Sequence, residues 1–279
     1  MIDRDGYPHG VPCWVDTTQP DPEAAARFYG ALFGWEFEPR TSPGAGPPYL
    51  VARLDGRDVA ALTGGAAASS ADWRTYVWVD DADATAAKIA EAGGTVDVAP
   101  TDVGDHGRTA AFTDPTGAGF RVWQAGTHRG AAIVNAAGSW NWSDLNTDEL
   151  ESARDFYAAV FGWRATAVDF GFGESWMWRV PGYAEFLERR DPGLRRRHAD
   201  AGAPEGFSDA IGWLLPAGGG PSRWAVTFSA GDTDATAEHA TRLGGEVVTA
   251  PYDAGPTRAA VLTDPQGAVF AISTYTPAS

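Results

Sequence analysis

Two stretches of the chain carry apolar side chains at the spacing of an amphipathic helix. Residues 21–35 and 149–163 are copies of one sequence, offset by 128 positions, and both have apolar residues at i, i+3, i+4 and i+7. This spacing places the apolar residues on one helix face. In the first copy Asp21 suits the N-cap, Pro22 the first helical position and Gly34 the left-handed turn after the last. Each copy is predicted to form a short helix.

Segments typical of strands surround the first helix. The sequence Asp55-Gly56 marks a hairpin turn between two of them. A run of small residues, 64–71, separates this unit from a second one. Strands are expected at residues 10–16, 48–54, 58–63, 73–80, 95–98, 109–113 and 120–123, and a second helix at 82–92. The first unit therefore has the order strand, helix, then two or three strands, and the second unit repeats it as strand, helix, three strands.

The same order returns in the second half, after a connection of polar and small residues at about 126–139. Residues 224–228 match the strand that begins at Trp73, and the Asp-Pro-x-Gly turn at 264–267 matches the one at 114–117. We therefore predict an α+β fold of four βαβββ units.

One segment, residues 188–204, has no counterpart in the first half. Its arginines are Arg189, Arg190, Arg195, Arg196 and Arg197. Because it lies between two predicted core strands, two interpretations are open. It is either a solvated surface insert or a lid that contacts an anion over a pocket.

The helix end with its Phe-Gly-Trp sequence and the Asp-Pro-x-Gly turn, each present twice, resemble the two recurring motifs of the vicinal oxygen chelate superfamily. This superfamily includes glyoxalase I, bleomycin-resistance proteins and extradiol dioxygenases. Within it, the chain is similar to tandem-domain actinobacterial proteins labelled glyoxalase-like or hydroxylase. The resemblance implies two cupped mixed β-sheet domains at residues 8–125 and 139–276, joined by a linker at 126–138.

The resemblance also implies where metal-dependent members would keep a His, Gln or Glu ligand on each of four strands. In the first half these positions are Trp14, Ala61, Arg74 and Arg121; in the second they are Trp142, Trp213, Ala225 and Ala271. Divalent-metal catalysis needs about three protein ligands that converge on one point. We therefore predict no metal site and no cofactor.

Tryptophan and arginine at these positions suggest contact with a flat organic molecule. In the second cup Trp142 and Trp213 offer stacking surface, and Trp176 and Trp178 are candidates for its rim. In the first cup Trp14 is accompanied by Arg74 and Arg121, which could hold a carboxylate. The alternatives are that the tryptophans are ordinary core residues and that the arginines point to solvent.

Three residues are candidates for acid–base chemistry: Asp16, Asp144 and His106. Asp16 and Asp144 follow Trp14 and Trp142 by two residues, so strand alternation puts each on the face of its tryptophan. Each could act as a general base, or could instead fix the turn into the helix. His106 lies in a loop whose second-half match keeps the Asp and Arg but has no His, which favours a structural role for that loop.

Charge and composition limit the classes of partner that the protein is expected to bind. The formal charge is -16, and Lys88 is the single lysine among 21 basic residues, so nucleic acid is excluded as an expected partner. The N-terminus lacks a signal-peptide pattern, no run of about 18 apolar residues could span a bilayer, and Cys13 has no partner for a disulfide. We expect a cytoplasmic protein whose partner is a small molecule, with a homodimer possible.

The leading functional hypothesis is a metal-free protein that binds a small aromatic or polycyclic metabolite in Trp-lined pockets, either to sequester it or to tailor it. One alternative is an enzyme of the lyase or oxygenase type, which uses Asp16, Asp144 or His106 or an unrecognised metal site. A second alternative is an interaction protein whose cups are filled by their own side chains.

Overall fold

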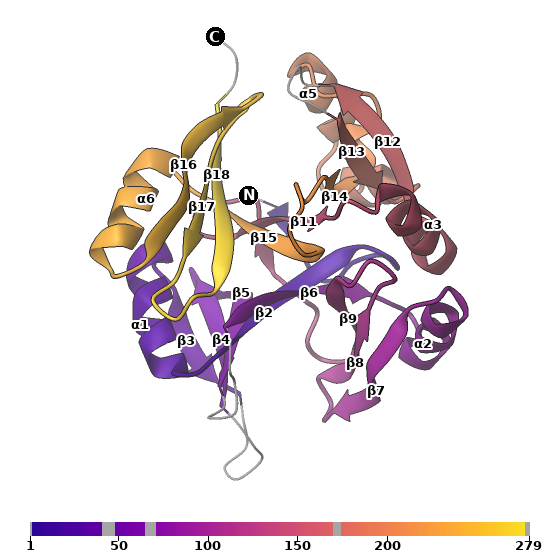
Figure 1. The fold of residues 1–279 in the computed structure, drawn as a ribbon, viewed down its shortest axis with the longest axis horizontal. Helices are drawn as coiled ribbons and strands as arrows, with labels where there is room; N and C mark the ends of the chain where they lie inside the picture. The colour runs from indigo at the N-terminus through magenta and orange to yellow at the C-terminus, as the bar shows by residue number, and fades with distance from the viewer. Residues whose placement is uncertain (1, 41–47, 65–70, 170–173, 277–279) are drawn as a thin grey trace.

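The computed structural model describes residues 2–40, 48–64, 71–169 and 174–276. It contains two eight-stranded mixed sheets (Figure 1). In the first sheet the strand order is β3-β4-β5-β2-β6-β9-β8-β7, and in the second it is β12-β13-β14-β11-β15-β18-β17-β16. Two consecutive βαβββ units therefore share each sheet, and the predicted α+β fold is confirmed.

The first sheet consists of β2 (Pro12–Gln19), β3 (Glu36–Pro39), β4 (Tyr49–Leu54), β5 (Arg57–Gly64), β6 (Asp72–Trp78), β7 (Thr95–Val103), β8 (Gly107–Thr113) and β9 (Gly119–Ala125). Its helices are α1 (Pro22–Phe33) and α2 (Ala82–Glu91). The second sheet consists of β11 (Trp140–Asn146), β12 (Arg164–Asp169), β13 (Glu174–Arg179), β14 (Ala210–Leu215), β15 (Arg223–Ser229), β16 (Glu246–Ala254), β17 (Thr257–Thr263) and β18 (Val269–Tyr275). Its helices are α3 (Leu150–Phe161) and α6 (Thr233–Arg242). A short β1 (Ile2–Asp3) pairs with β10 (Ile133–Val134).

The first helix begins and ends as its sequence predicts. Asp21 accepts a hydrogen bond of 2.9 Å from the amide of Ala24, and Pro22 is the first helical residue. Gly34 takes a φ of 74° after the last turn, a conformation that favours glycine. In the second copy, Gly162 has the same left-handed conformation, but the N-cap residue Glu149 makes no side-chain capping bond.

The two domains pack against each other through the helix-covered faces of their sheets. Helix α1 lies beside α6, and α2 lies beside α3 (Figure 1). Between the sheets, the Thr75 hydroxyl on β6 donates a hydrogen bond of 2.8 Å to the Ser143 hydroxyl on β11. Aromatic rings from both domains meet around this contact, as when Trp73 packs edge-on against Phe228. The opposite face of each sheet, here called its cup, points away from the other domain.

The segment without a counterpart, 188–204, is part of a longer insert of small helices between β13 and β14: α4 (Tyr183–Glu188), α5 (Leu194–Asp200) and the 3-10 turn η1 (Phe207–Asp209). Three of its arginines form ion pairs with acidic residues at the surface: Arg190 with Asp5, Arg195 with Glu185, and Arg197 with Asp191. Its apolar residues Leu187 and Leu194 are buried. The segment is therefore a packed insert whose paired arginines lie on its surface.

Among the residues that the structure describes, no helix is both long and apolar enough to span a bilayer.

Candidate ligand-binding site

The cup faces of the two sheets present matched positions. In the first sheet, Asp16 and Trp14 on β2 lie opposite Arg74 and Tyr76 on β6. On the other side of β6, Tyr76 pairs with Arg121 of β9. Thr75 contacts the other domain, so its neighbours in sequence point the opposite way, into the cup.

The second sheet repeats this register with different residues. Asp144 lies opposite Ala225 and Trp142 opposite Thr227, with Ala271 next along from Thr227. The positions derived from the family motifs therefore do converge on one cup per domain. The residues that occupy them differ between the cups in size and charge.

In the first cup the Asp16 carboxylate is fully occupied by neighbouring side chains. Arg74 Nε donates to Asp16 Oδ1 at 2.8 Å, and Tyr76 Oη donates to Asp16 Oδ2 at 2.7 Å. The Arg121 guanidinium lies 5.8 Å from the centre of the Tyr76 ring. Asp16 is only 1% exposed, so this carboxylate is a buried, charge-neutralised part of the sheet.

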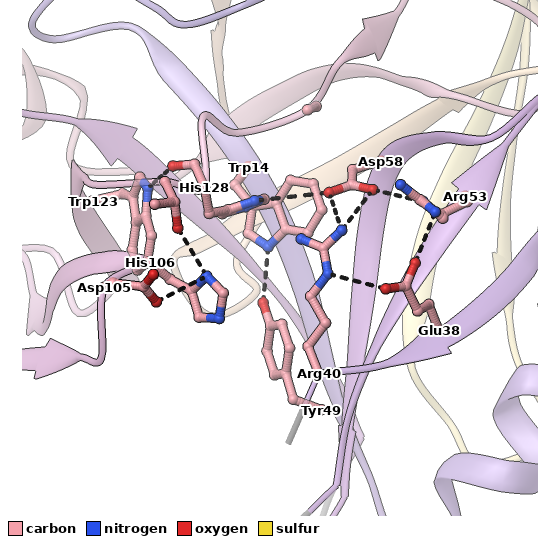
Figure 2. Close-up of polar contacts among 12 residues, drawn as sticks. Trp14, Glu38, Arg40, Tyr49, Arg53, Asp58, Asp105, His106, Trp123 and His128 are labelled. Atoms are coloured by element: carbon pink, nitrogen blue, oxygen red, sulfur yellow. Dashed lines mark hydrogen bonds and ion pairs between the residues drawn. The ribbon is translucent and has the colours of Figure 1, made fainter. Parts of the chain in front are cut away.

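Trp14 is also covered, by Tyr49 of β4 and by His128 of the linker (Figure 2). Its Nε1 atom donates to Tyr49 Oη at 3.0 Å, and the His128 ring packs edge-on against it with 4.5 Å between ring centres. Trp123 Nε1 in turn donates to the His128 carbonyl at 3.0 Å. Trp14 is 2% exposed, so no ligand can stack on it without moving His128.

His128 itself is a neutral imidazole whose side chain is 12% exposed. Its Nδ1 atom lies 3.9 Å from Asp58 Oδ2, and Arg40 and Arg53 bind the same carboxylate at 2.9 and 3.0 Å (Figure 2). Burial lowers the pKa of His128 to about 4, against the opposing effect of Asp58. Sequence reasoning missed this histidine because no spacing relates it to Trp14; only the path of the linker brings the two rings together.

His106 lies outside the cup floor. It occupies the turn between β7 and β8, with a side chain 42% exposed, and its Nδ1 atom lies 3.2 Å from the Thr127 hydroxyl (Figure 2). The rest of its loop is held by Arg108, which binds Asp83 and Asp102. Arg258 repeats this arrangement in the second domain with Asp234 and Asp253. The repeated Asp and Arg therefore form a structural pairing between loop and helix.

The second cup keeps the carboxylate but lacks the residues that neutralise it. Asp144 Oδ1 accepts a hydrogen bond of 2.9 Å from the Trp213 amide. Ala225, Thr227 and Ala271 replace the two arginines and the tyrosine of the first cup. Burial raises the pKa of Asp144 to about 7, against the opposing effect of the Trp213 amide. Asp16 is buried, whereas Asp144 is only half-buried.

Aromatic side chains border this carboxylate. Trp142 and Trp213 are both half-buried and lie on the same face of the sheet as Asp144. Tyr252 on β16 is 45% exposed, and its pKa is raised by partial burial and by the Asp144 charge. Phe207 of the insert packs edge-on against Trp142. The second cup thus combines flat apolar surface with one carboxyl group.

Trp176 and Trp178 lie on the other face of the sheet, not at the rim of this cup. In the register of β13 and β14, Met177 is opposite Trp213, so the residues on either side of Met177 point away from Trp213. Trp178 is fully buried against Tyr157 and Trp163 in the interface between the domains. Trp176 lies under the Arg154 guanidinium of α3. The sequence pattern could not distinguish these faces, because the strand register was unknown.

The residues of neither cup fit a divalent metal ion of the kind that the superfamily's metal enzymes hold. In the first cup both oxygens of Asp16 are engaged by Arg74 and Tyr76. In the second cup Asp144 is surrounded by Trp142, Trp213 and alanines, which supply no further anionic or imidazole ligand. Across the described part of the chain, no group of three or more His, Cys, Asp or Glu side chains could hold an ion.

Comparison with known proteins agrees with this architecture. Residues 14–122 match the sequence model of the Glyoxalase/Bleomycin resistance protein/Dioxygenase superfamily, and residues 143–273 match that of a glyoxalase-like domain. The chain is 37% identical over 277 residues to "Putative glyoxylase CFP32" of Mycobacterium tuberculosis, covering 98% of this chain and 97% of that protein. It is 34% identical over 278 residues to the "Anthracycline biosynthesis protein DnrV" of Streptomyces peucetius, covering 94% and 92%.

Solved structures share the fold at low sequence identity. A Mn(II)-bound glyoxalase from Novosphingobium aromaticivorans has a TM-score of 0.60 at 17% identity, covering 95% of this chain and 82% of that one. A 2,2',3-trihydroxybiphenyl 1,2-dioxygenase from Sphingomonas wittichii has a TM-score of 0.60 at 13% identity, covering 97% and 92%. On the strength of its sequence relatives and its two cupped sheets, the chain belongs to the Glyoxalase/Bleomycin resistance protein/Dioxygenase superfamily.

Proposed function

We propose that this protein binds one small, flat organic molecule in its second cup, without a metal ion. The observation that carries this proposal is the contrast between matched positions. Where the first cup has Arg74 and Arg121, the second has Ala225 and Ala271, while the carboxylate is kept at Asp144. Removing two long side chains leaves room beside a polar group, which is the composition of a small-molecule site.

Trp142 and Trp213 would supply stacking surface for the ligand, and Asp144 would bind one of its polar groups. With a pKa of about 7, the Asp144 carboxyl exists in both protonation states near neutral pH. It can therefore accept a hydrogen bond from a phenolic hydroxyl or donate one to a keto oxygen. A hydroxylated aromatic or quinone-like molecule meets both requirements.

The relationship to DnrV supports a polycyclic aromatic ligand, because that protein is named for anthracycline biosynthesis. The family relationship supports a small-molecule partner more generally, since its structural neighbours include a glyoxalase and a dioxygenase.

A second candidate function is proton transfer to or from the bound molecule, which would make the protein an enzyme that tailors its ligand. The raised pKa of Asp144 favours it, because a general acid or base works best when its pKa is near the operating pH. No step through a metal ion is part of this candidate.

Alizarin (1,2-dihydroxyanthraquinone) is a suitable probe, since it is flat, hydroxylated and quenches tryptophan fluorescence. The proposal predicts saturable binding of one alizarin per chain, and native mass spectrometry of freshly purified protein should show at most one bound small molecule. Two equivalent sites per chain, or no binding by alizarin and no co-purified molecule, would contradict it.

A further inference from the structure

A separate cavity of about 120 Å³ lies where the insert meets the N-terminal segment and the start of β11. Its walls are partly apolar, with Val11, Leu194, Phe207 and Ile211 among the lining residues. Its polar groups come from residues that include Arg4, Tyr183, His198 and Ser208. Trp142 borders both this cavity and the second cup, but Asp144 and Trp213 do not line the cavity.

Arg4 is an arginine in this wall without a carboxylate partner in the described part of the chain. Its guanidinium lies between two aromatic rings, 5.0 Å from the centre of Tyr7 and 5.6 Å from that of Tyr183, and its Nη1 donates to Tyr183 Oη. Its Nε atom is shielded from solvent and has no hydrogen-bond partner among the described residues. A buried N–H of a charged group without an acceptor is costly, so an acceptor is expected there.

The remaining polar groups add no charge to the cavity. His198 Nδ1 lies 2.9 Å from the Ser208 hydroxyl, and burial followed by the nearby Arg197 lowers the pKa of the imidazole, so His198 is neutral at pH 7. The insert arginines Arg190 and Arg195 are paired with Asp5 and Glu185. Among the residues that line the cavity, Arg4 is therefore the one that brings a positive charge, and it lies among neutral polar and apolar side chains.

We infer that this cavity binds a small organic monocarboxylate, whose carboxylate pairs with Arg4 and Tyr183 and whose hydrocarbon part lies against Leu194, Phe207 and Ile211. One positive charge matches one negative charge, whereas a doubly charged phosphate or sulfate would keep one charge without a cationic partner in the cavity lining. A water takes about 30 Å³ of liquid, so the cavity has room for roughly four waters or a compact acid. This inference does not depend on the proposed ligand of the second cup.

The inference is tested by isothermal titration calorimetry of the whole protein at pH 7. The ligands are benzoate and propionate, and the controls are their neutral amides, benzamide and propionamide. At least one acid should bind, at least about tenfold more tightly than its amide, because only the acid pairs with the guanidinium. Inorganic phosphate should bind more weakly than that acid. If neither acid binds, or if acid and amide bind equally, the inference is wrong.

Substitutions in the cavity wall test whether the acid binds at Arg4 and Tyr183. Arg4→Met should weaken the acid at least about tenfold, and Tyr183→Phe should weaken it less. The matched control, Arg195→Met, removes an exposed insert arginine and should leave the affinity unchanged. If Arg4→Met does not fold, the comparison of acid with amide in Tyr183→Phe decides, because the preference for the acid should shrink there. Ala225→Arg, which closes the second cup, should not affect benzoate. In Ala225→Arg, weaker alizarin binding with benzoate binding intact would support both proposals, whereas a wild type that binds benzoate but not alizarin would overturn only the second-cup proposal.

Discussion

The hydroxyl of Tyr29 on α1 donates a hydrogen bond of 2.9 Å to the carboxylate of Asp264 in the other domain. The mirror pair is present as well, with Tyr157 Oη donating to Asp114 Oδ2 at 2.8 Å. Each pair joins the tyrosine of one helix copy to the aspartate of the Asp-Pro-x-Gly turn in the opposite domain. The two motifs that mark the superfamily in this sequence are therefore one interdomain contact, formed twice.

Removing one of these hydroxyls should weaken the interface between the domains. Tyr29→Phe leaves the buried Asp264 with one hydrogen bond fewer, although Gln19 still donates to it at 2.7 Å. We expect a loss of about 1–2 kcal/mol in the free energy of unfolding, measured by urea denaturation at pH 7. Tyr275→Phe, which changes a tyrosine that is 55% exposed, should have almost no effect. Equal effects from the two variants would show that the contact does not stabilise the fold.

The sequence was sufficient for the helices of the repeated units, because local patterns determine them, but not for α4 and α5 of the insert. Asp21, Pro22 and Gly34 act within one or two helical turns, and they take the predicted roles. The contact between Tyr29 and Asp264 could not be predicted in this way, since 235 residues separate the two.

In the candidate site, too, local spacing could be read from the sequence, whereas contacts between distant segments could not. The motif spacing chose positions that lie at matching places in the two sheets, with Asp16 opposite Arg74 and Asp144 opposite Ala225. It could not show that His128 returns over Trp14, or that Trp178 turns away from the cup, because the first depends on the path of the linker and the second on strand register. It also could not show that Arg74 and Ala225 occupy matching positions in the two sheets, since that depends on the strand pairing.

The raised pKa of Asp144 should make the stability of the fold depend on pH. Its folded-state pKa of about 7 lies above that of an unfolded aspartate, so the folded protein holds the proton to higher pH and loses stability as the pH rises from about 4 to 7. Asp144→Asn removes this loss. We subtract the free energy of unfolding of the wild type from that of Asp144→Asn at each pH. This difference should be about 1–3 kcal/mol more favourable to the variant at pH 8 than at pH 5.

The matched variant Asp16→Asn should behave differently, because it leaves Arg74 without its ion pair. It should be less stable than wild type at pH 5 and at pH 8, by about 2–4 kcal/mol. If the difference between Asp144→Asn and wild type were the same at both pH values, the Asp144 carboxyl would have an ordinary pKa.

Aromatic stacking in the second cup is tested by a pair of tryptophans on opposite faces of neighbouring strands. Trp213→Ala should weaken alizarin by about 1–3 kcal/mol, or roughly 5- to 150-fold, because stacking surface is lost. Trp176→Ala, on the face that carries α3, should leave the affinity within about twofold. Fluorescence titrations measure both, and a larger effect from Trp176→Ala would place the ligand elsewhere.

Removal of divalent metal should change nothing. After exhaustive dialysis against EDTA, we expect the melting temperature and the affinity for alizarin to be the same as before. Calorimetric titration of the dialysed protein with Zn²⁺, Mn²⁺ or Fe²⁺ should show no tight stoichiometric binding, because neither cup provides about three ligands. A one-to-one complex that depends on Asp144 would refute the metal-free proposal.

The most direct test of the second-cup site is to convert it into a copy of the first. Ala225→Arg puts a guanidinium opposite Asp144, where Arg74 lies opposite Asp16. The new ion pair should fill the space and neutralise the carboxylate. In fluorescence titrations the wild type should bind one alizarin per chain, and Ala225→Arg should bind it at least about tenfold more weakly while remaining folded. Equal affinity in the two proteins would contradict the account, since the ligand would then occupy another place.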